Sequence, residues 1–459
     1  MTMLANSAAA RDIRYQIHPQ TNIRQHEQDG PLIITRGEGA YIYDDSGNRY
    51  LDAMSGLWCV ALGYSDTSIK EAVKAQIDEL PYFHMFAHRS NNPSIDLAEK
   101  LIQNSPGMSR VVFQCSGSEA NDTAVKLIWY YWNALGRPEK KKIIARKRAY
   151  HGTGIASGSL TFLPNIHREF DLPIDRFLHV SCPHYYREGL PGESEADFVK
   201  RMADELEQLI LAEGPETVGG FFAEPVMGTG GVVMPPEGYF EAIQAVLDKY
   251  EVLTVSDEVI CGFGRTGTYW GAEAVGYKPD MITCAKALSS AYLPISAVIV
   301  SEKIVDAMRE QSDKVGVFGH GYTYGGHPVC AAAALASLNR YEELDTTRNA
   351  RETGAYFQKR LAELKDHPIV GEVRGIGLMA GVELVSDKKT KAPFDTSVGV
   401  AAACSRFALE RGLVTRNLGE TMSFSPPLIV TTKEIDIIVD TFREALDQTL
   451  AWANAKAAA

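Results

Sequence analysis

Two charged residues stand where buried strands are expected to end. Asp257 follows the apolar run 252–256, and Lys286 directly follows the apolar run 281–285. Both runs have the length and composition of short buried strands. Ligands of an open α/β sheet bind at the carboxyl ends of its strands. Each strand would therefore deliver one charged side chain to a common binding site.

This pair of residue types predicts a specific chemistry. A lysine can form a Schiff base with a carbonyl, and a buried carboxylate can pair with the protonated ring nitrogen of a cofactor. Pyridoxal 5'-phosphate (PLP) needs both. The acidic pair Asp257 and Glu258 could instead bind a metal, but His84 and His88 lie in a separate aromatic segment without a neighbouring glutamate. We therefore expect no metal in the site.

The composition is that of an ordinary soluble globular protein, with 459 residues, 45% of them hydrophobic and 23% charged. A net charge of −12 argues against nucleic acid or an anionic membrane as the main partner. The seven cysteines are scattered, without a C-x-x-C motif, and the N-terminus lacks the features of a signal peptide. These features predict a cytoplasmic protein with reduced thiols and no membrane-spanning helix.

The middle of the chain alternates helical patterns with short apolar runs. The expected strands are 110–113, 142–145, 177–180, 219–223, 252–256, 281–285 and 295–300. Seven strands separated by helices predict an α/β fold with a doubly wound, mostly parallel sheet.

The ends of the chain differ from its middle. Residues 1–30 are polar and irregular in pattern, and residues 31–52 are typical of a β-meander. After about residue 330 come an alanine-rich helix, an apolar segment and further helices. We therefore expect a large PLP-binding domain at 66–329 and a smaller, discontinuous α+β domain made of 1–65 and 330–459.

A Ser-Gly-Ser turn follows the first strand of the predicted sheet and precedes a helix. Free backbone N–H groups at the start of that helix, near Gly117, could bind phosphate together with the Ser118 hydroxyl. An ordinary serine N-cap is the alternative, because serine is a preferred cap.

Two further strand ends carry polar or aromatic residues. Tyr150 could stack on a planar cofactor, or could be a half-buried residue at the sheet edge. His151 is more typical of a hydrogen-bonded structural histidine than of a catalytic one. Glu224 precedes a glycine-rich loop and could contact a cofactor or substrate, or form a loop salt bridge.

Taken together, these motifs resemble those of the class III PLP-dependent aminotransferases. The similar segments include Asp257–Val259, Gly262–Gly267 with Lys286, Ser116–Ala120, Tyr150–Gly152, Glu224-Pro225 and His320–Thr323, and the resemblance runs from about residue 15 to 450. Segments 56–60 and 414–416 resemble the ω-amino acid–pyruvate (ω-transaminase) subgroup. The resemblance implies PLP-transferase fold type I, with a mostly parallel seven-stranded sheet in the large domain.

The resemblance also implies roles for individual residues. Lys286 and Asp257 would be catalytic: the lysine would hold PLP and transfer a proton, and the carboxylate would pair with the pyridine N–H. Thr323 would reach the phosphate of the neighbouring subunit's cofactor, which implies an obligatory homodimer, with tetramers left open. The full set of implied cofactor-binding residues is Gly117, Ser118, Tyr150, His151, Glu224, Asp257, Val259, Lys286, Tyr322 and Thr323.

The implied substrate pocket contains Trp58, Phe86, Tyr150 and Arg416. Arg416 would swing in to clamp a carboxylate and swing out for an amine that lacks one. A static surface ion pair is the alternative for this arginine. The three aromatic residues would favour a substrate with an apolar body.

This chain departs from the family pattern at four positions. Ala287 replaces the usual glycine, and Cys115 replaces an asparagine found in many relatives. Gln20 and Ala87 stand where relatives selective for aromatic amines tend to carry phenylalanine. The last two changes predict a roomier or more polar entrance. We therefore expect aliphatic ω-amino acids or diamines to be better donors than arylalkyl amines.

The expected activity is transfer of an amino group from a primary amine or an ω-amino acid, such as β-alanine or 4-aminobutyrate, to pyruvate by a ping-pong route. The alternatives are other fold-type-I PLP enzymes, namely an aminomutase, racemase or decarboxylase. A non-catalytic PLP-binding protein is a further alternative.

Overall fold

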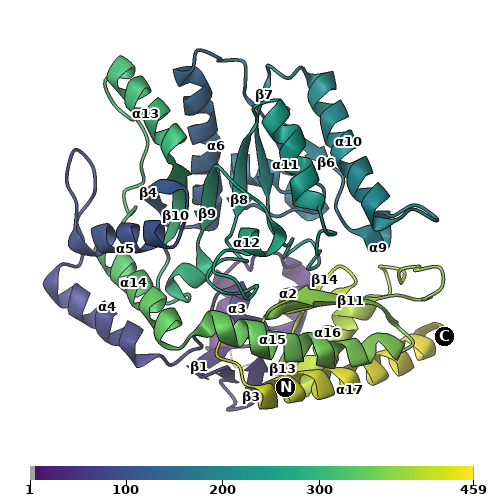
Figure 1. Ribbon diagram of the computed structural model, residues 1–459. Helices are drawn as coiled ribbons and strands as arrows, with labels where there is room; N and C mark the ends of the chain where they lie inside the picture. The colour runs from purple at the N-terminus through teal and green to yellow at the C-terminus, as the bar shows by residue number, and fades with distance from the viewer. Residues whose placement is uncertain (1–5, 458–459) are drawn as a thin grey trace.

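The computed structural model describes residues 6–457, and Figure 1 shows its elements. The strands are β1 (Ile34–Glu38), β2 (Tyr41–Asp44), β3 (Arg49–Asp52), β4 (Met108–Gln114), β5 (Lys142–Arg146), β6 (Phe177–Val180), β7 (Val218–Ala223), β8 (Leu253–Asp257), β9 (Met281–Cys284), β10 (Ser296–Ser301), β11 (Val370–Ile376), β12 (Met379–Leu384), β13 (Leu413–Val414), β14 (Arg416–Leu418) and β15 (Thr421–Phe424).

Helices cover both faces of the central sheet. They are α1 (Ala8–Tyr15), α2 (Ile23–Asp29), α3 (Ser55–Trp58), α4 (Thr67–Glu79), α5 (Asn92–Gln103), α6 (Gly117–Ala134), α7 (Ile155–Leu160), α8 (Pro164–His167), α9 (Tyr185–Glu188), α10 (Glu195–Glu213), α11 (Tyr239–Lys249), α12 (Gly271–Val275), α13 (Glu302–Val315), α14 (Pro328–Glu343), α15 (Thr346–Ala362), α16 (Val400–Glu410) and α17 (Thr432–Ala457), with 3-10 helices η1 (Lys286–Ser289) and η2 (Glu363–Asp366). Helices α15 and α16 pack against strands of the smaller sheets.

The central sheet has seven strands in the order β4-β10-β9-β8-β7-β5-β6. Strand β10 runs antiparallel to both β4 and β9, and the other pairs are parallel. Strands β7, β8 and β9 are buried along their whole length. Because both faces of these strands are buried, their sequences form continuous apolar runs. The prediction of seven strands in a mostly parallel sheet is confirmed.

Successive residues of each strand pack on opposite faces of this sheet. Phe222 packs in a core shared with α6 and α13, whereas Phe221 packs in a core shared with α10 and α11. This alternation follows from the two-residue period of a strand. Because helices cover both faces, a ligand can approach the central strands only at their ends.

Two four-stranded sheets come from the ends of the chain. One has the order β1-β2-β3-β13 and the other β11-β12-β15-β14. Strand β13 pairs in parallel with β3, which places the purple N-terminal strands beside the yellow-green C-terminal segment in Figure 1. The domain boundaries expected from the sequence, 66–329 against 1–65 with 330–459, remain a prediction.

One sequence expectation fails near the N-terminus. Within residues 6–30 the chain is not irregular but forms two short helices, α1 and α2. Their caps explain this: the side chain of Ser7 accepts from Ala10 N, and that of Asn22 accepts from Gln25 N.

The expectation of no signal peptide rests in part on residues 1–5, which lie outside the described residues. None of the described helices is both long and apolar enough to cross a bilayer.

Candidate active site

A cavity of about 1130 Å³ opens at the carboxyl ends of the central strands. It combines residues from β8, from the segment after β9, from the start of α6 and from strand β14. Most of the site residues predicted from the sequence line it, namely Trp58, Gly117, Ser118, Tyr150, His151, Glu224, Asp257, Val259, Lys286 and Arg416.

Asp257 is the last residue of β8, and three groups hold its buried carboxylate. Oδ2 accepts from Asn121 Nδ2 at 2.8 Å and lies 2.8 Å from Nδ1 of His151, while Oδ1 accepts from the backbone N–H of Val259 at 3.1 Å. Asn121 in turn accepts from the Thr283 hydroxyl at 2.8 Å. The orientation of the carboxylate is therefore fixed by side chains from separate elements.

Lys286 follows β9 and begins the turn η1 with a φ of +48°. This left-handed conformation is uncommon for a residue with a side chain and is found at functional sites. Burial lowers the pKa of the Lys286 amine, and the nearby Asp257 charge opposes that effect. A lower pKa increases the fraction of neutral amine, which is the nucleophilic form.

The start of α6 shows which serine of the Ser-Gly-Ser turn caps the helix. Ser116 is the N-cap, because its hydroxyl accepts from Glu119 N at 3.2 Å. This leaves Gly117 and Ser118, in the first turn, facing the cavity. A Cβ on Gly117 would lie 3.1 Å from Val259 Cγ1. A serine cap at this helix start therefore leaves the N–H groups of its first turn at the cavity, and anion binding by Gly117 and Ser118 remains a prediction.

Glu224 and Tyr150 are linked through the backbone. The Glu224 carboxylate is buried and accepts from Tyr150 N at 3.1 Å and from Gly228 N at 3.0 Å. Burial raises its pKa. Among the described residues no lysine or arginine forms an ion pair with this carboxylate, and Arg146 donates to the backbone carbonyl of Glu224 instead, so the loop salt bridge considered from the sequence does not form.

Arg416 lies on β14, opposite Ser423 of β15, and its guanidinium is half-buried at the cavity. No carboxylate among the described residues forms an ion pair with it. Burial lowers its pKa, and Tyr150 opposes that effect. The static ion pair considered from the sequence is therefore absent from this arrangement.

Three of the predicted residues lie elsewhere in this chain. Phe86 and Tyr322 line a second cavity of about 610 Å³, together with Ala87. Thr323 is exposed, and its carbonyl accepts from the Tyr82 hydroxyl at 2.8 Å. Within one chain, Phe86 is thus not brought to Trp58 and Tyr150, and Ala87 does not border the first cavity.

Asn121 and Arg148 also line the cavity, although neither was predicted as a site residue. Asn121 lies one helical turn beyond Gly117 and Ser118, a spacing that could have indicated Asn121 as a site residue.

Glu258, next to Asp257, accepts from the backbone N–H groups of Gly271 and Ala272 at 2.8 and 2.7 Å.

The fold and the lining of this cavity define a family. The family model described as aminotransferase class-III matches residues 23–446, and the chain belongs to that family. A probable γ-aminobutyrate transaminase 2, mitochondrial, from Oryza sativa subsp. indica is 49% identical over 91% of this chain and 85% of its own length. A γ-aminobutyrate transaminase 3, chloroplastic, from Solanum lycopersicum is 46% identical over 98% of this chain and 88% of its own.

Solved structures agree with these relatives. The ω-transaminase of Pseudomonas jessenii, as a thermostable six-fold mutant, has a TM-score of 0.96 and 50% identity, covering 97% of this chain and 99% of that one. The same enzyme is known in complex with PMP, again with a TM-score of 0.96 and 50% identity. The protein is therefore an aminotransferase that uses PLP, and the aminomutase, racemase and decarboxylase alternatives are not favoured.

The residues of the cavity fit PLP. Gly117 has no Cβ to crowd Val259 at the first turn of α6, and the buried Asp257 carboxylate lines the same cavity, so an anionic group and a protonated ring nitrogen could both be bound there. Among the described residues that line the cavity, Lys286 is the only lysine. When bound, PLP withdraws electrons from the carbon that carries the transferred amino group.

Proposed function

We propose that this enzyme transfers an amino group from a primary amine or ω-amino acid to pyruvate by a ping-pong mechanism. One observation carries the proposal: the Lys286 amine, the Asp257 carboxylate and the unpaired Arg416 guanidinium share one cavity. The names of the rice and tomato relatives, γ-aminobutyrate transaminases, and of the Pseudomonas jessenii ω-transaminase support this donor class.

The cofactor roles are part of the proposal. Asp257, held by His151 and Asn121, would accept a hydrogen bond from the pyridine N–H, and Lys286 would hold PLP and serve as the proton carrier of the site. Tyr150 and Val259 would contact the ring. Gly117 and Ser118 would hold the phosphate with the N–H groups at the start of α6, where the helix dipole favours an anion. Glu224 contributes by fixing the backbone of Tyr150.

Arg416 recognises the carboxylate of the acceptor. A guanidinium can bind a carboxylate through two parallel hydrogen bonds, and no internal acid competes for it. The same side chain can leave the cavity when the donor has no carboxylate there. Trp58 then supplies a buried apolar wall, since its side chain is 1% exposed.

The entrance supports aliphatic ω-amino acids or diamines as donors. Pro19 and Gln20 line the cavity, and the amide of Gln20 accepts a hydrogen bond from Asn165. A charged ammonium or carboxylate group loses its water at a lower free-energy cost in a polar entrance than in one lined by phenyl rings. A kinetic preference for 1-phenylethylamine over β-alanine and 4-aminobutyrate would contradict this donor class.

The active unit is a homodimer in this proposal. Phe86, Tyr322 and Thr323 lie outside the first cavity of their own chain, in a region with several exposed apolar side chains, including Phe83, Met85 and Tyr324. Such a surface favours burial against a partner. There Thr323 would complete the partner's phosphate site, and Phe86 would complete its substrate pocket.

A cytoplasmic location remains our expectation, although the names of the rice and tomato relatives place those proteins in mitochondria and chloroplasts.

Complementation tests the shared site. Lys286→Ala chains and Thr323→Glu chains are expected to be inactive or weak as homodimers. Co-expressed with different affinity tags and purified as mixed dimers, they are expected to regain turnover, because one of the two sites then has both an intact lysine and an intact threonine. Mixed dimers as inactive as either parent would contradict the shared site.

The donor class is tested by a half-reaction. The PLP-loaded enzyme is mixed with β-alanine in the absence of an acceptor, and the absorption spectrum is followed. The yellow band is expected to convert to that of the pyridoxamine form, and pyruvate is expected to restore it. Lys286→Ala is expected to lose both the yellow colour and turnover. Conversion with arylalkyl amines but not with β-alanine, 4-aminobutyrate or diamines would overturn the proposed donor class.

A further inference from the structure

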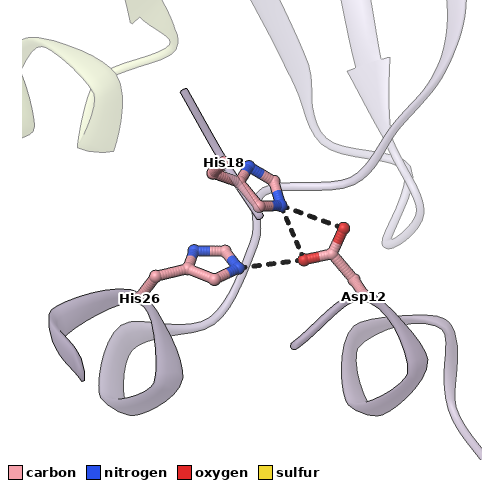
Figure 2. Close-up of side chains that lie close together, drawn as sticks. All are labelled: Asp12, His18 and His26. Atoms are coloured by element: carbon pink, nitrogen blue, oxygen red, sulfur yellow. Dashed lines mark hydrogen bonds and ion pairs between the residues drawn. The ribbon is translucent and has the colours of Figure 1, made fainter. Parts of the chain in front are cut away.

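Three metal-ligating side chains converge in the N-terminal segment, outside the active site (Figure 2). Nε2 of His18 lies 3.1 and 2.9 Å from the two carboxylate oxygens of Asp12, and Nε2 of His26 lies 2.9 Å from one of them. The two imidazole rings have centroids 4.1 Å apart. All three ligand atoms lie within 4.8 Å of one another.

The local fold produces this convergence. Asp12 lies in α1, His26 in α2, and His18 in the segment that joins the two helices. Each helix has its own side-chain N-cap, Ser7 for α1 and Asn22 for α2. The helices can therefore form without the contacts between the two histidines and Asp12. Both imidazoles present the same nitrogen, Nε2, to the same carboxylate. The side chains are only partly exposed, at 15% for Asp12 and 12% for His26.

We propose that Asp12, His18 and His26 bind one divalent transition-metal ion of the zinc type. Two imidazole nitrogens and a carboxylate oxygen are ligands that Zn²⁺ accepts, and three protein ligands leave a position for water. Metal–ligand bonds of about 2.0–2.1 Å in a tetrahedral site place the ligand atoms roughly 3.3 Å apart, so the 2.9 Å contacts between the imidazoles and Asp12 would need to lengthen only slightly to admit one ion. The expectation of no metal concerned Asp257 and Glu258, whereas Asp12, His18 and His26 are six and eight positions apart in the sequence and meet only in the folded chain.

A second group with the same residue types shows why this one is different. His184 lies 2.9 Å from Glu372 and near Glu383, and these atoms also satisfy the spacing of metal ligands. Arg374 already forms ion pairs with both carboxylates at 2.6 Å, and Arg187 pairs with Glu383. Guanidinium groups therefore fill the cation position there, whereas no lysine or arginine among the described residues pairs with Asp12.

The proposed site would also act on the active-site entrance. His18 is the immediate neighbour of Pro19, and Pro19 and Gln20 line the large cavity. A metal that joins α1 to α2 through His18 would restrain this part of the entrance. Metal binding is therefore expected to change KM for bulky donors more than kcat, because Pro19 and Gln20 are exposed lining residues, whereas Asp257 is buried.

Metal binding itself is the primary test. PLP-loaded enzyme is titrated with Zn²⁺ by calorimetry, and its metal content is measured after gel filtration. The wild type is expected to bind one more Zn²⁺ per chain than Asp12→Asn or the double variant His18→Gln, His26→Gln. His367→Gln is the matched control, because His367 pairs with a single carboxylate, that of Asp447, and lacks a second imidazole. Equal binding by the wild type and both variants would overturn the proposal.

Two further measurements separate this site from adventitious binding. Co²⁺ is expected to give the absorption bands of a low-symmetry nitrogen and oxygen site in the wild type but not in the double variant. Bands of thiolate ligation that disappear after cysteine alkylation would instead overturn the assignment. Trypsin cleavage at the exposed Arg14 and Arg24, which flank His18, is expected to slow with Zn²⁺ only when the three ligands are present. This protection does not depend on the donor class.

Discussion

Nδ1 of His151 and Oδ2 of Asp257 lie 2.8 Å apart, and both side chains are almost completely buried. The same carboxylate oxygen accepts from Asn121. The carboxylate that we propose pairs with the cofactor ring is therefore held by Asn121, His151 and the backbone N–H of Val259. Fixing a charged group in advance avoids the cost of reorienting it during reaction.

Asn121→Ala is expected to lower kcat and weaken PLP retention roughly 10- to 100-fold, because a hydrogen bond to a charged group contributes about 1.5–3 kcal/mol. The measurements are steady-state kinetics and the PLP concentration needed for half-saturation of the apoenzyme. Asn133→Ala serves as control: it lies on the same helix, but is exposed and bonds only Lys141. Similar losses in both variants would show a general effect on α6.

Arg416→Ala is expected to raise KM for pyruvate roughly 10- to 100-fold, through loss of hydrogen bonds between charged groups. The half-reaction with a donor that lacks a carboxylate is expected to be nearly unchanged. Arg406→Ala, which removes an exposed arginine paired with Glu410, is expected to change neither. An equal loss in both half-reactions of Arg416→Ala would argue for a structural role instead.

The rate at which apoenzyme takes up PLP is expected to depend on pH through Lys286. Burial lowers the pKa of this amine below its usual value of 10.5, so the neutral form accumulates at a lower pH than for a free lysine. The rate is therefore expected to rise with pH and to level off below that value. Because the Asp257 charge raises the same pKa, Asp257→Asn is expected to move the midpoint further down. A midpoint at or above the usual value would contradict this environment.

Gly117→Ala is expected to weaken PLP binding, because the added Cβ would lie 3.1 Å from Val259 and crowd the phosphate cradle. The double variant Gly117→Ala, Val259→Ala is expected to recover part of the affinity. Equilibrium dialysis of PLP measures both. If the single variant binds PLP as tightly as the wild type, the phosphate does not lie against this helix start.

Much of the active site was predictable from strand ends alone. Asp257 and Lys286 each follow an apolar run, and parallel strands bring their carboxyl ends to one edge. That local pattern is sufficient to place both side chains in one cavity. Ser116 and Gly117 were likewise predictable at the start of α6, because the Ser-Gly-Ser turn follows an apolar run and precedes a helical pattern.

What the sequence determined by itself is the content of the sheet and the residues at its carboxyl edge, since both depend on patterns a few residues long. Tertiary structure decided the rest. Only packing between α6, β8 and the loop after β5 joins Asn121 and His151 to Asp257, and only the chain's path places Phe86 in a different cavity from Trp58. The approach of Asp12, His18 and His26 likewise needs two helices to pack, because short-range patterns carry no information about which elements meet.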